Sequence, residues 1–309
     1  MDEVHHFTYG LITPTFAYAM SFLGSLLGLV ITARARVATQ RRRRAWLLVM
    51  AAWAIGGTGI WVMHFMAMIG FSVPNSPLRF DVPITAASFV LAVVTVGIGL
   101  FIVGMGRPSV VKVLIGGPVT GVSVALMHYT GMAAMRINGT FGYDRDLVIA
   151  SFAIAVVAAT VALWFTLVVR GMMATIAAAA VMGVAVTGMH YTGMAAMFVH
   201  RSPEVHPVPG VDVNWFLAPI VLFVLMVVIA LASAVMAVPS EREQQEADDV
   251  RRKLGGGSTM TPGPRAGLGV NGTFSQNGGA GGVPAPKASQ AFAARAANGV
   301  ADARRQRGR

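Results

Sequence analysis

Three histidines stand in matching surroundings along the chain, and each is followed four residues later by a methionine. A glycine also precedes each histidine by seven residues. The histidines are 64 and 62 residues apart, which is the length of one helical hairpin per repeat. An imidazole beside a thioether is a ligand pair for a soft metal ion. The three segments read Trp61-Val62-Met63-His64-Phe65-Met66-Ala67-Met68, Met127-His128-Tyr129-Thr130-Gly131-Met132 and Met189-His190-Tyr191-Thr192-Gly193-Met194.

Helical geometry predicts how these side chains lie relative to one another. Residues i and i+4 share a helix face, so each histidine is expected to share a face with Met68, Met132 or Met194. The methionines that directly precede the histidines are expected to point elsewhere, roughly 100° round the helix. The preceding glycines lie two turns away and allow neighbouring helices to approach closely.

The donor set favours copper, particularly Cu(I), because thioether and imidazole groups occur together without thiolate or carboxylate groups. Zinc would also be expected to recruit cysteine or a carboxylate, and the chain has no cysteine. Nine of the 19 methionines fall in the windows 63–71, 127–135 and 189–197, which favours a shared site over methionine as packing filler. The candidate ligands on these shared faces are therefore His64, Met68, His128, Met132, His190 and Met194.

The rest of the sequence is typical of a membrane protein. Hydrophobic residues make up 55% of the 309 residues and charged residues 12%, about half of the roughly 25% usual in soluble proteins. A membrane-spanning helix needs about 20 mostly apolar residues. The predicted fold is an all-α integral membrane bundle of seven helices, with the three histidines at one depth near its outer face. The predicted spans are 11–33, 46–70, 83–104, 113–135, 147–169, 172–198 and 215–238.

Basic residues are unequally divided between the two sides of this bundle. Nine of them follow the first, third and fifth spans, and the opposite loops hold four. By the positive-inside rule the first side is cytoplasmic, so we expect the N-terminus outside, the C-terminus inside and a multi-pass protein of the inner membrane. The run 41–44 is expected to be a loop against lipid headgroups. This topology explains the positive charge, and nucleic acid is not expected as a partner.

Two regions are predicted from composition. Residues 8–238 are expected to form the membrane domain, and residues 239–309 a cytoplasmic low-complexity tail. The tail is expected to be disordered because its composition cannot bury a core. The membrane part contains no carboxylate pair, no nucleophile with its base and no phosphate-binding loop, so the chain is not expected to be an enzyme.

The tetrads Met127-His128-Tyr129-Thr130 and Met189-His190-Tyr191-Thr192 resemble the signature of the MHYT family of bacterial membrane sensor domains. The resemblance covers about residues 8–238. It implies a sensor that binds copper through the methionines and histidines of the motif and thereby detects oxygen, carbon monoxide or nitric oxide. Carried over to this chain, the metal ligands that the resemblance implies are Met63, His64, Met68, Met127, His128, Met132, Met189, His190 and Met194. The first copy departs from the tetrad, with Phe65 and Met66 in place of tyrosine and threonine.

The resemblance also bears on how a signal leaves the membrane. Many family members carry cytoplasmic domains that make or degrade cyclic di-GMP, or a histidine kinase. The tail of this chain is too short and too polar for such a domain, so signalling through a separate cytoplasmic or membrane partner is expected. Copper transport, storage or delivery is the alternative function, and haem binding through histidine and methionine is a third.

Overall fold

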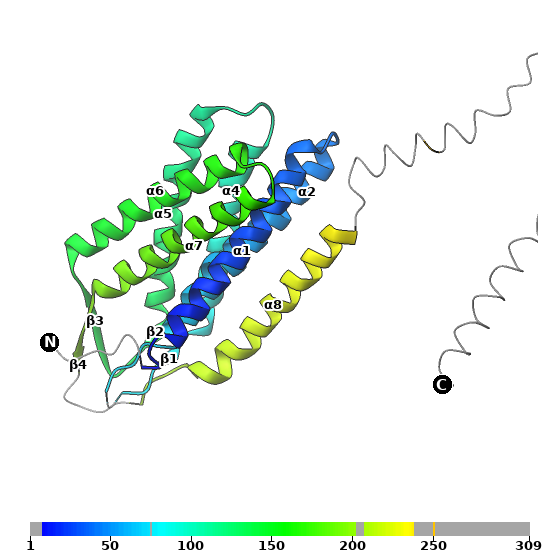
Figure 1. Ribbon diagram of the computed structural model, residues 1–309. Helices are drawn as coiled ribbons and strands as arrows, with labels where there is room; N and C mark the ends of the chain where they lie inside the picture. The colour runs from blue at the N-terminus through cyan, green and yellow to red at the C-terminus, as the bar shows by residue number, and fades with distance from the viewer. Residues whose placement is uncertain (1–7, 75, 202–206, 238–249, 251–309) are drawn as a thin grey trace, which may run out of the picture. The chain divides into compact units, whose positions relative to one another are not determined.

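The computed structural model describes residues 8–74, 76–201, 207–237 and 250. Most of them are helical, and Figure 1 shows long helices packed side by side, with short strands gathered at one end of the bundle. The chain divides into two units, Met1–Ala247 and Asp248–Arg309, and every element below belongs to the first. The predicted tail at 239–309 lies outside the described residues, apart from residue 250.

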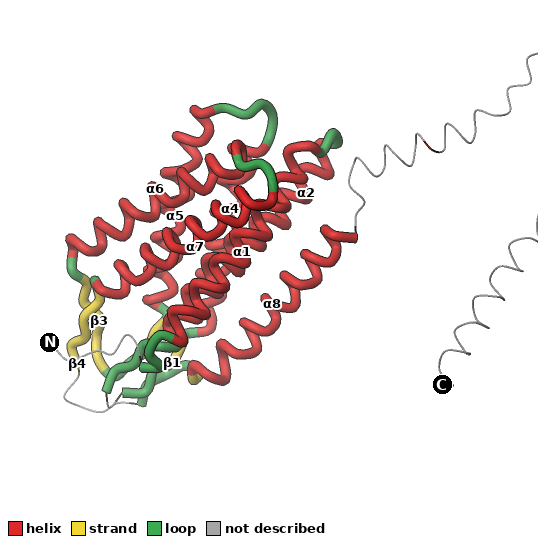
Figure 2. The backbone as a smooth tube through the Cα atoms, viewed as in Figure 1, coloured by secondary structure: helices red, strands yellow, loops and turns green. Residues whose placement is uncertain are grey.

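Nine helical segments and five strands make up the described part of the chain (Figure 2). The helices are α1 (Ile12–Val37), α2 (Arg41–Ala52), η1 (Trp53–Val62), α3 (Met63–Met68), α4 (Val82–Gly104), α5 (Val110–Ala133), α6 (Arg145–Val168), α7 (Met172–Ala195) and α8 (Val213–Ala237). The strands are β1 (Arg79–Phe80), β2 (Met135–Arg136), β3 (Gly139–Tyr143), β4 (Met197–Arg201) and β5 (Val211–Asp212).

Among the described residues, six helical stretches are long and apolar enough to cross a membrane, and they coincide with the first six predicted spans. The second of them, Arg41–Met68, joins α2, η1 and α3 into one continuous helix. The seventh predicted span, 215–238, coincides with α8, which is a helix as expected. That α8 crosses the membrane, and that the N-terminus faces outward, stay predictions.

The second span contains a ten-residue π-helix, η1, which ends directly before Met63 and His64. Every η1 residue except Trp53 is buried. Glycine allows this segment to touch its neighbours: a Cβ atom at Gly56 would lie 2.7 Å from the carbonyl oxygen of Ala92 in α4. π-Helical segments are rare and are frequently found at functional sites. No pattern in the sequence predicted this one.

Five short strands lie where α4 and α6 begin and where α5 and α7 end, which we call the strand end (Figure 1). They pair antiparallel in the order β2-β1-β5 and as the hairpin β3-β4. Phe80 of β1 is fully buried, and its ring centroid lies 5.6 Å from that of Phe65, the residue after His64. The strands therefore close the bundle on the side where the histidine-bearing helices end.

Two aspartates connect successive repeats at the strand end. The Asp81 carboxylate accepts a hydrogen bond from the Ile84 N–H at the start of α4, and the Asp81 N–H donates to the Ala134 carbonyl at the end of α5. Asp144 likewise caps the start of α6, and its N–H donates to the Ala196 carbonyl at the end of α7. Each aspartate thus holds the end of the histidine-bearing helix in the next repeat.

Three cations at the opposite end, which we call the basic end, donate to carbonyl groups where helices finish. Arg36 donates to the end of α6, Arg44 to the end of α1 and Lys112 to the end of α4. Such contacts satisfy free carbonyls and suit the negative end of the helix dipole. The prediction that the run 41–44 is a loop is wrong, because these residues form the first turn of α2.

The Asp81 carboxylate gives a testable pH dependence. It accepts from the Ile84 N–H and pairs with Arg136 at 3.0 Å, and both contacts lower the pKa of Asp81 below its usual value. A lowered folded-state pKa stabilises the fold above the unfolded pKa of about 4, and this stabilisation is lost as the pH falls through the folded value. We expect Asp81→Asn to unfold at a lower temperature than the wild type at pH 7, with the difference shrinking below about pH 4.

Thermal unfolding in detergent, followed by tryptophan fluorescence across this pH range, measures the effect. Asp146→Asn is the matched control, because Asp146 is an exposed acidic residue in the first turn of α6. A difference in unfolding temperature between Asp81→Asn and the wild type that stays constant with pH would contradict a contribution of the Asp81 charge to stability.

Candidate metal centre

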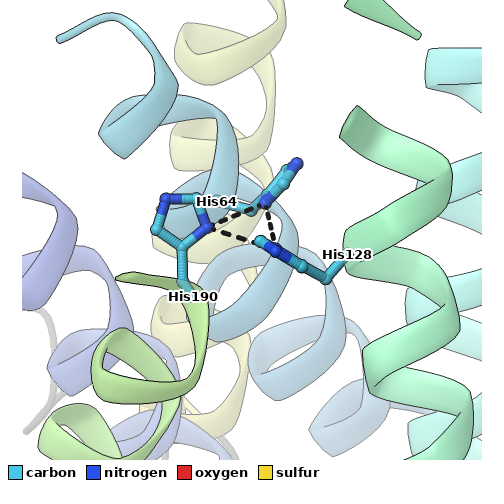
Figure 3. A group of neighbouring side chains, drawn as sticks. All are labelled: His64, His128 and His190. Atoms are coloured by element: carbon cyan, nitrogen blue, oxygen red, sulfur yellow. Dashed lines mark hydrogen bonds between the residues drawn. The ribbon is translucent and has the colours of Figure 1, made fainter. Parts of the chain in front are cut away.

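The three repeated histidines meet in the interior of the bundle (Figure 3). His64 lies in α3, His128 in α5 and His190 in α7, and each side chain is at most 1% exposed. Their Nδ1 atoms are separated by 3.0 Å (His64–His190), 3.1 Å (His64–His128) and 3.3 Å (His128–His190). The prediction that the three histidines share one site agrees with this geometry, whereas the direct approach of their rings was not predicted.

The three imidazoles are arranged with near threefold symmetry. Neighbouring ring planes meet at 82° to 88°, and the ring centroids are 4.9 to 5.0 Å apart. The point equidistant from the three Nδ1 atoms lies about 1.8 Å from each of them, close to the 2.0–2.1 Å of a zinc–imidazole bond. The three histidines could thus hold one metal ion.

Hydrogen bonding alone cannot satisfy this arrangement. The Nδ1 atom of a neutral imidazole is either a donor or an acceptor. Among three mutually adjacent Nδ1 atoms, at least two have the same role, so one pair brings two hydrogens or two lone pairs together. A cation bound to three lone pairs removes this conflict. The donor set therefore fits a metal ion better than it fits a closed hydrogen-bond network.

Glycine makes room for two of the imidazole rings. A methyl group at Gly131 would overlap Nε2 of His64, and a methyl group at Gly193 would overlap Nε2 of His128. Each glycine follows the histidine of its own helix by three residues, so each repeat receives the ring of the preceding one. The first copy has the small residue Ala67 at this position. This role of Gly131 and Gly193 was not predicted from the sequence, because the spacing within one helix does not identify the ring that meets it from the next helix.

Beside the histidines lies a small cavity that is too tight for a water molecule. Its wall is formed by the three histidines with Ile60, Met63, Met127 and Met189. The methionines four residues after the histidines are not part of this wall, although all three are buried. The expectation that the preceding methionines point elsewhere is therefore wrong.

The direction of helical side chains explains this difference. The Cα–Cβ bond tilts toward the helix N-terminus, so a side chain covers the turn before its own Cα. The His64 ring accordingly lies with Ile60 and Met63, which precede it, and not with Met68. Sequence spacing alone identifies the shared face but not the direction in which the side chain leans along it.

Other side chains of the motif have structural roles. The Thr130 and Thr192 hydroxyls donate to carbonyls of their own helices, as their positions four residues after Leu126 and Gly188 allow. The Tyr129 hydroxyl is within 2.8 Å of the Ser151 hydroxyl in α6. These contacts hold the helices that carry the histidines.

The glycine contacts lead to a prediction. We expect Gly193→Ala to push the His128 ring out of position and to cost about 1–3 kcal/mol of stability through overpacking. Gly188→Ala in the same helix is the matched control, because a Cβ atom there meets nothing within 4 Å. Alanine at position 188 is expected to leave stability unchanged or raise it by up to about 1 kcal/mol.

Thermal or denaturant unfolding of the two variants in one detergent measures this difference. Equal unfolding curves for Gly193→Ala and Gly188→Ala would show that position 193 does not support the histidine.

Comparison with known proteins agrees with the threefold arrangement. A family model described as "MHYT: Bacterial signalling protein N terminal repeat" matches residues 57–117, 121–179 and 183–247. Each match begins at the glycine seven residues before a histidine, at Gly57, Gly121 or Gly183. No solved structure is significantly similar to the chain.

Several signalling proteins are similar in sequence to the chain. "Bifunctional diguanylate cyclase/cyclic di-GMP phosphodiesterase MucR" of Pseudomonas aeruginosa is 35% identical over 242 residues, which are 76% of this chain and 35% of MucR. "Cyclic di-GMP phosphodiesterase NbdA" of the same species is 37% identical over 147 residues, 46% of this chain and 19% of NbdA. "Signaling protein YkoW" of Bacillus subtilis is 28% identical over 203 residues, 63% of this chain and 25% of YkoW. The chain thus spans about a third of MucR and less of the other two. With three copies of the repeat built around one histidine cluster, it belongs to the MHYT family of bacterial signalling proteins.

Proposed function

We propose that the chain is a membrane sensor module that binds one copper ion through His64, His128 and His190 and responds to a diatomic gas or to redox state. The convergence of three Nδ1 atoms within 3.3 Å of one another is the observation that carries this proposal. Copper held there would supply a site for O₂, CO or NO and one-electron redox chemistry. The protein supplies three nitrogen donors in an apolar, water-excluding interior.

The choice of copper rests on the surroundings of the histidines. Met63, Met127 and Met189 line the same small cavity as the three histidines, and no cysteine or carboxylate is among the described residues of its wall. Thioether and imidazole groups together suit Cu(I). A structural zinc site would be expected to recruit cysteine or a carboxylate as well. A porphyrin has no room between nitrogens that are 3.0 to 3.3 Å apart, so haem is less well supported.

The helices that hold the histidines offer a path for the signal. His64 lies two residues after the end of the π-helix η1, and α8 packs along η1 and α1. Repacking around the histidines would move η1 and, through it, α8. MucR and NbdA are named for making or degrading cyclic di-GMP. We propose that this chain passes its signal to a separate cytoplasmic or membrane partner in that kind of signalling.

Copper transport, storage or delivery is the alternative. A transporter needs ligands or polar groups at successive depths. Toward the basic end, the space next to the histidine cluster is instead lined mainly by apolar side chains, including Leu100, Val124 and Leu163. This arrangement favours a single fixed site over a path for ions.

Metal content tests the proposal. We expect about one copper ion per chain in detergent-purified wild type, measured by inductively coupled plasma mass spectrometry after copper loading, and loss of most of it in the triple variant His64→Ala, His128→Ala, His190→Ala. His200→Ala is the control, because His200 is an exposed histidine of β4. Unchanged copper in the triple variant would overturn the ligand assignment.

The two methionine sets give a second test. We expect the variant in which Met63, Met127 and Met189 are all changed to Leu to bind Cu(I) about tenfold more weakly or worse, because it loses the thioethers beside the histidines. The variant with Leu at positions 68, 132 and 194 is the matched control, with the same number of thioethers removed from the buried core. Competition with a Cu(I) chelator measures both affinities. Equal affinities would exclude a role for the preceding methionines in binding.

A further inference from the structure

An apolar cavity of about 60 Å³ lies in the middle of the bundle, between η1, α4, α5, α6 and α7. Its wall consists mainly of aliphatic side chains, with small alanines contributed by α6 and α7. Thr120 and Thr166 supply the only hydroxyls of the wall, and the Thr166 hydroxyl donates to the Leu163 carbonyl. A buried water needs two to four polar partners, and this wall cannot supply them. The cavity therefore suits a small uncharged molecule better than water or an ion.

The central cavity adjoins the histidine cluster. Ile60 and Met189 belong to the walls of both the central cavity and the small cavity beside the histidines. Ile60 lies one helical turn before His64, and Met189 directly precedes His190. Two flexible or aliphatic side chains thus separate the central cavity from the three nitrogens.

The central cavity also adjoins the outer surface of the bundle. Ala158, Met182 and Ala185 belong both to its wall and to the wall of an open apolar groove between α6 and α7. The same groove is bordered by Val157 and Val181, which are 64% and 52% exposed. In a chain that spans a membrane, apolar side chains exposed at this level contact lipid tails. The groove therefore opens toward the bilayer core.

We propose that these three spaces form an apolar route by which small, uncharged, apolar molecules pass from the bilayer to the histidine cluster, with the central cavity as a binding site on the way. Dry apolar cavities of proteins bind such molecules, xenon among them. The central cavity exceeds the roughly 10–15 Å³ that one water requires and is far too small for a lipid chain. Its use for gas sensing rests on the proposed function, whereas binding in the cavity does not.

Xenon is the probe for the central cavity, since it is apolar, uncharged and independent of any metal. We expect saturable xenon binding to the full chain in lipid nanodiscs, measured by ¹²⁹Xe nuclear magnetic resonance. Ala159→Phe, which fills the cavity from α6, is expected to weaken it by about tenfold or more. Val119→Phe is the matched control, because Val119 is 48% exposed and lines none of the three spaces. Ala159→Leu is the smaller substitution if phenylalanine prevents folding.

The outcomes separate this proposal from the metal assignment. No saturable xenon binding in the wild type, or equal binding in Ala159→Leu or Ala159→Phe and the wild type, overturns the cavity as a site. Xenon binding that persists in a protein unable to bind copper leaves the cavity intact and overturns only the proposed function. In copper-loaded protein, Ala185→Phe is expected to slow CO binding about tenfold at unchanged copper content, because Ala185 lies between groove and cavity. An unchanged CO rate would overturn the route.

Discussion

The mutual approach of three imidazole nitrogens in an apolar interior is the constraint on which the bundle depends. At separations of 3.0 to 3.3 Å, three neutral rings cannot all exchange favourable hydrogen bonds. Polar groups left unsatisfied in a membrane interior are costly, and the site persists only if the surrounding helices impose it or a cation resolves it. The rest of the structure shows how the helices impose it.

Two kinds of support recur, each in two of the three repeats. Because Gly131 and Gly193 have no side chain, the histidine ring of the preceding repeat can lie against the helix backbone. Asp81 and Asp144 attach the ends of the histidine-bearing helices to the starts of their neighbours. The first copy differs, with Ala67 at the glycine position and the π-helix η1 before its histidine. The threefold arrangement is therefore approximate, and its irregular member is the one that α8 contacts.

Much of the fold and of the site was predictable because it depends on periodic signals. The spans follow from apolar runs of about 20 residues, and the common depth of the histidines follows from the matched repeats. The strands were missed because segments of two to five residues show no measurable alternation. η1 was missed because a helix buried on nearly all sides has no polar face that reveals its period.

The wrong predictions have a different origin. They concern the direction in which side chains point and the partners that they meet on other helices. The expectation that Met63 points away from the histidine site used spacing but not the lean of the side chains toward the helix N-terminus. The role of Arg44 depends on the carbonyls of α1, which no local pattern identifies. Asp81, Asp144 and Asp212 each directly precede a helix, and this repeated position was a signal in the sequence that went unused.

Polar contacts are concentrated at the two ends of the bundle, whereas the interior between them contains a loosely packed cavity. Side-chain hydrogen bonds fasten the helix ends, through Asp81 and Asp144 at the strand end and through Arg36 at the basic end. Between these ends, alanines of α6 and α7 surround a cavity that leaves dispersion contacts unmade. A movement of the histidine side chains would therefore disrupt fewer packing contacts on the side of the cavity than at the hydrogen-bonded helix ends. η1 borders this cavity and also contacts α8, so in the proposed sensor η1 is the segment through which a change at the histidines would reach α8.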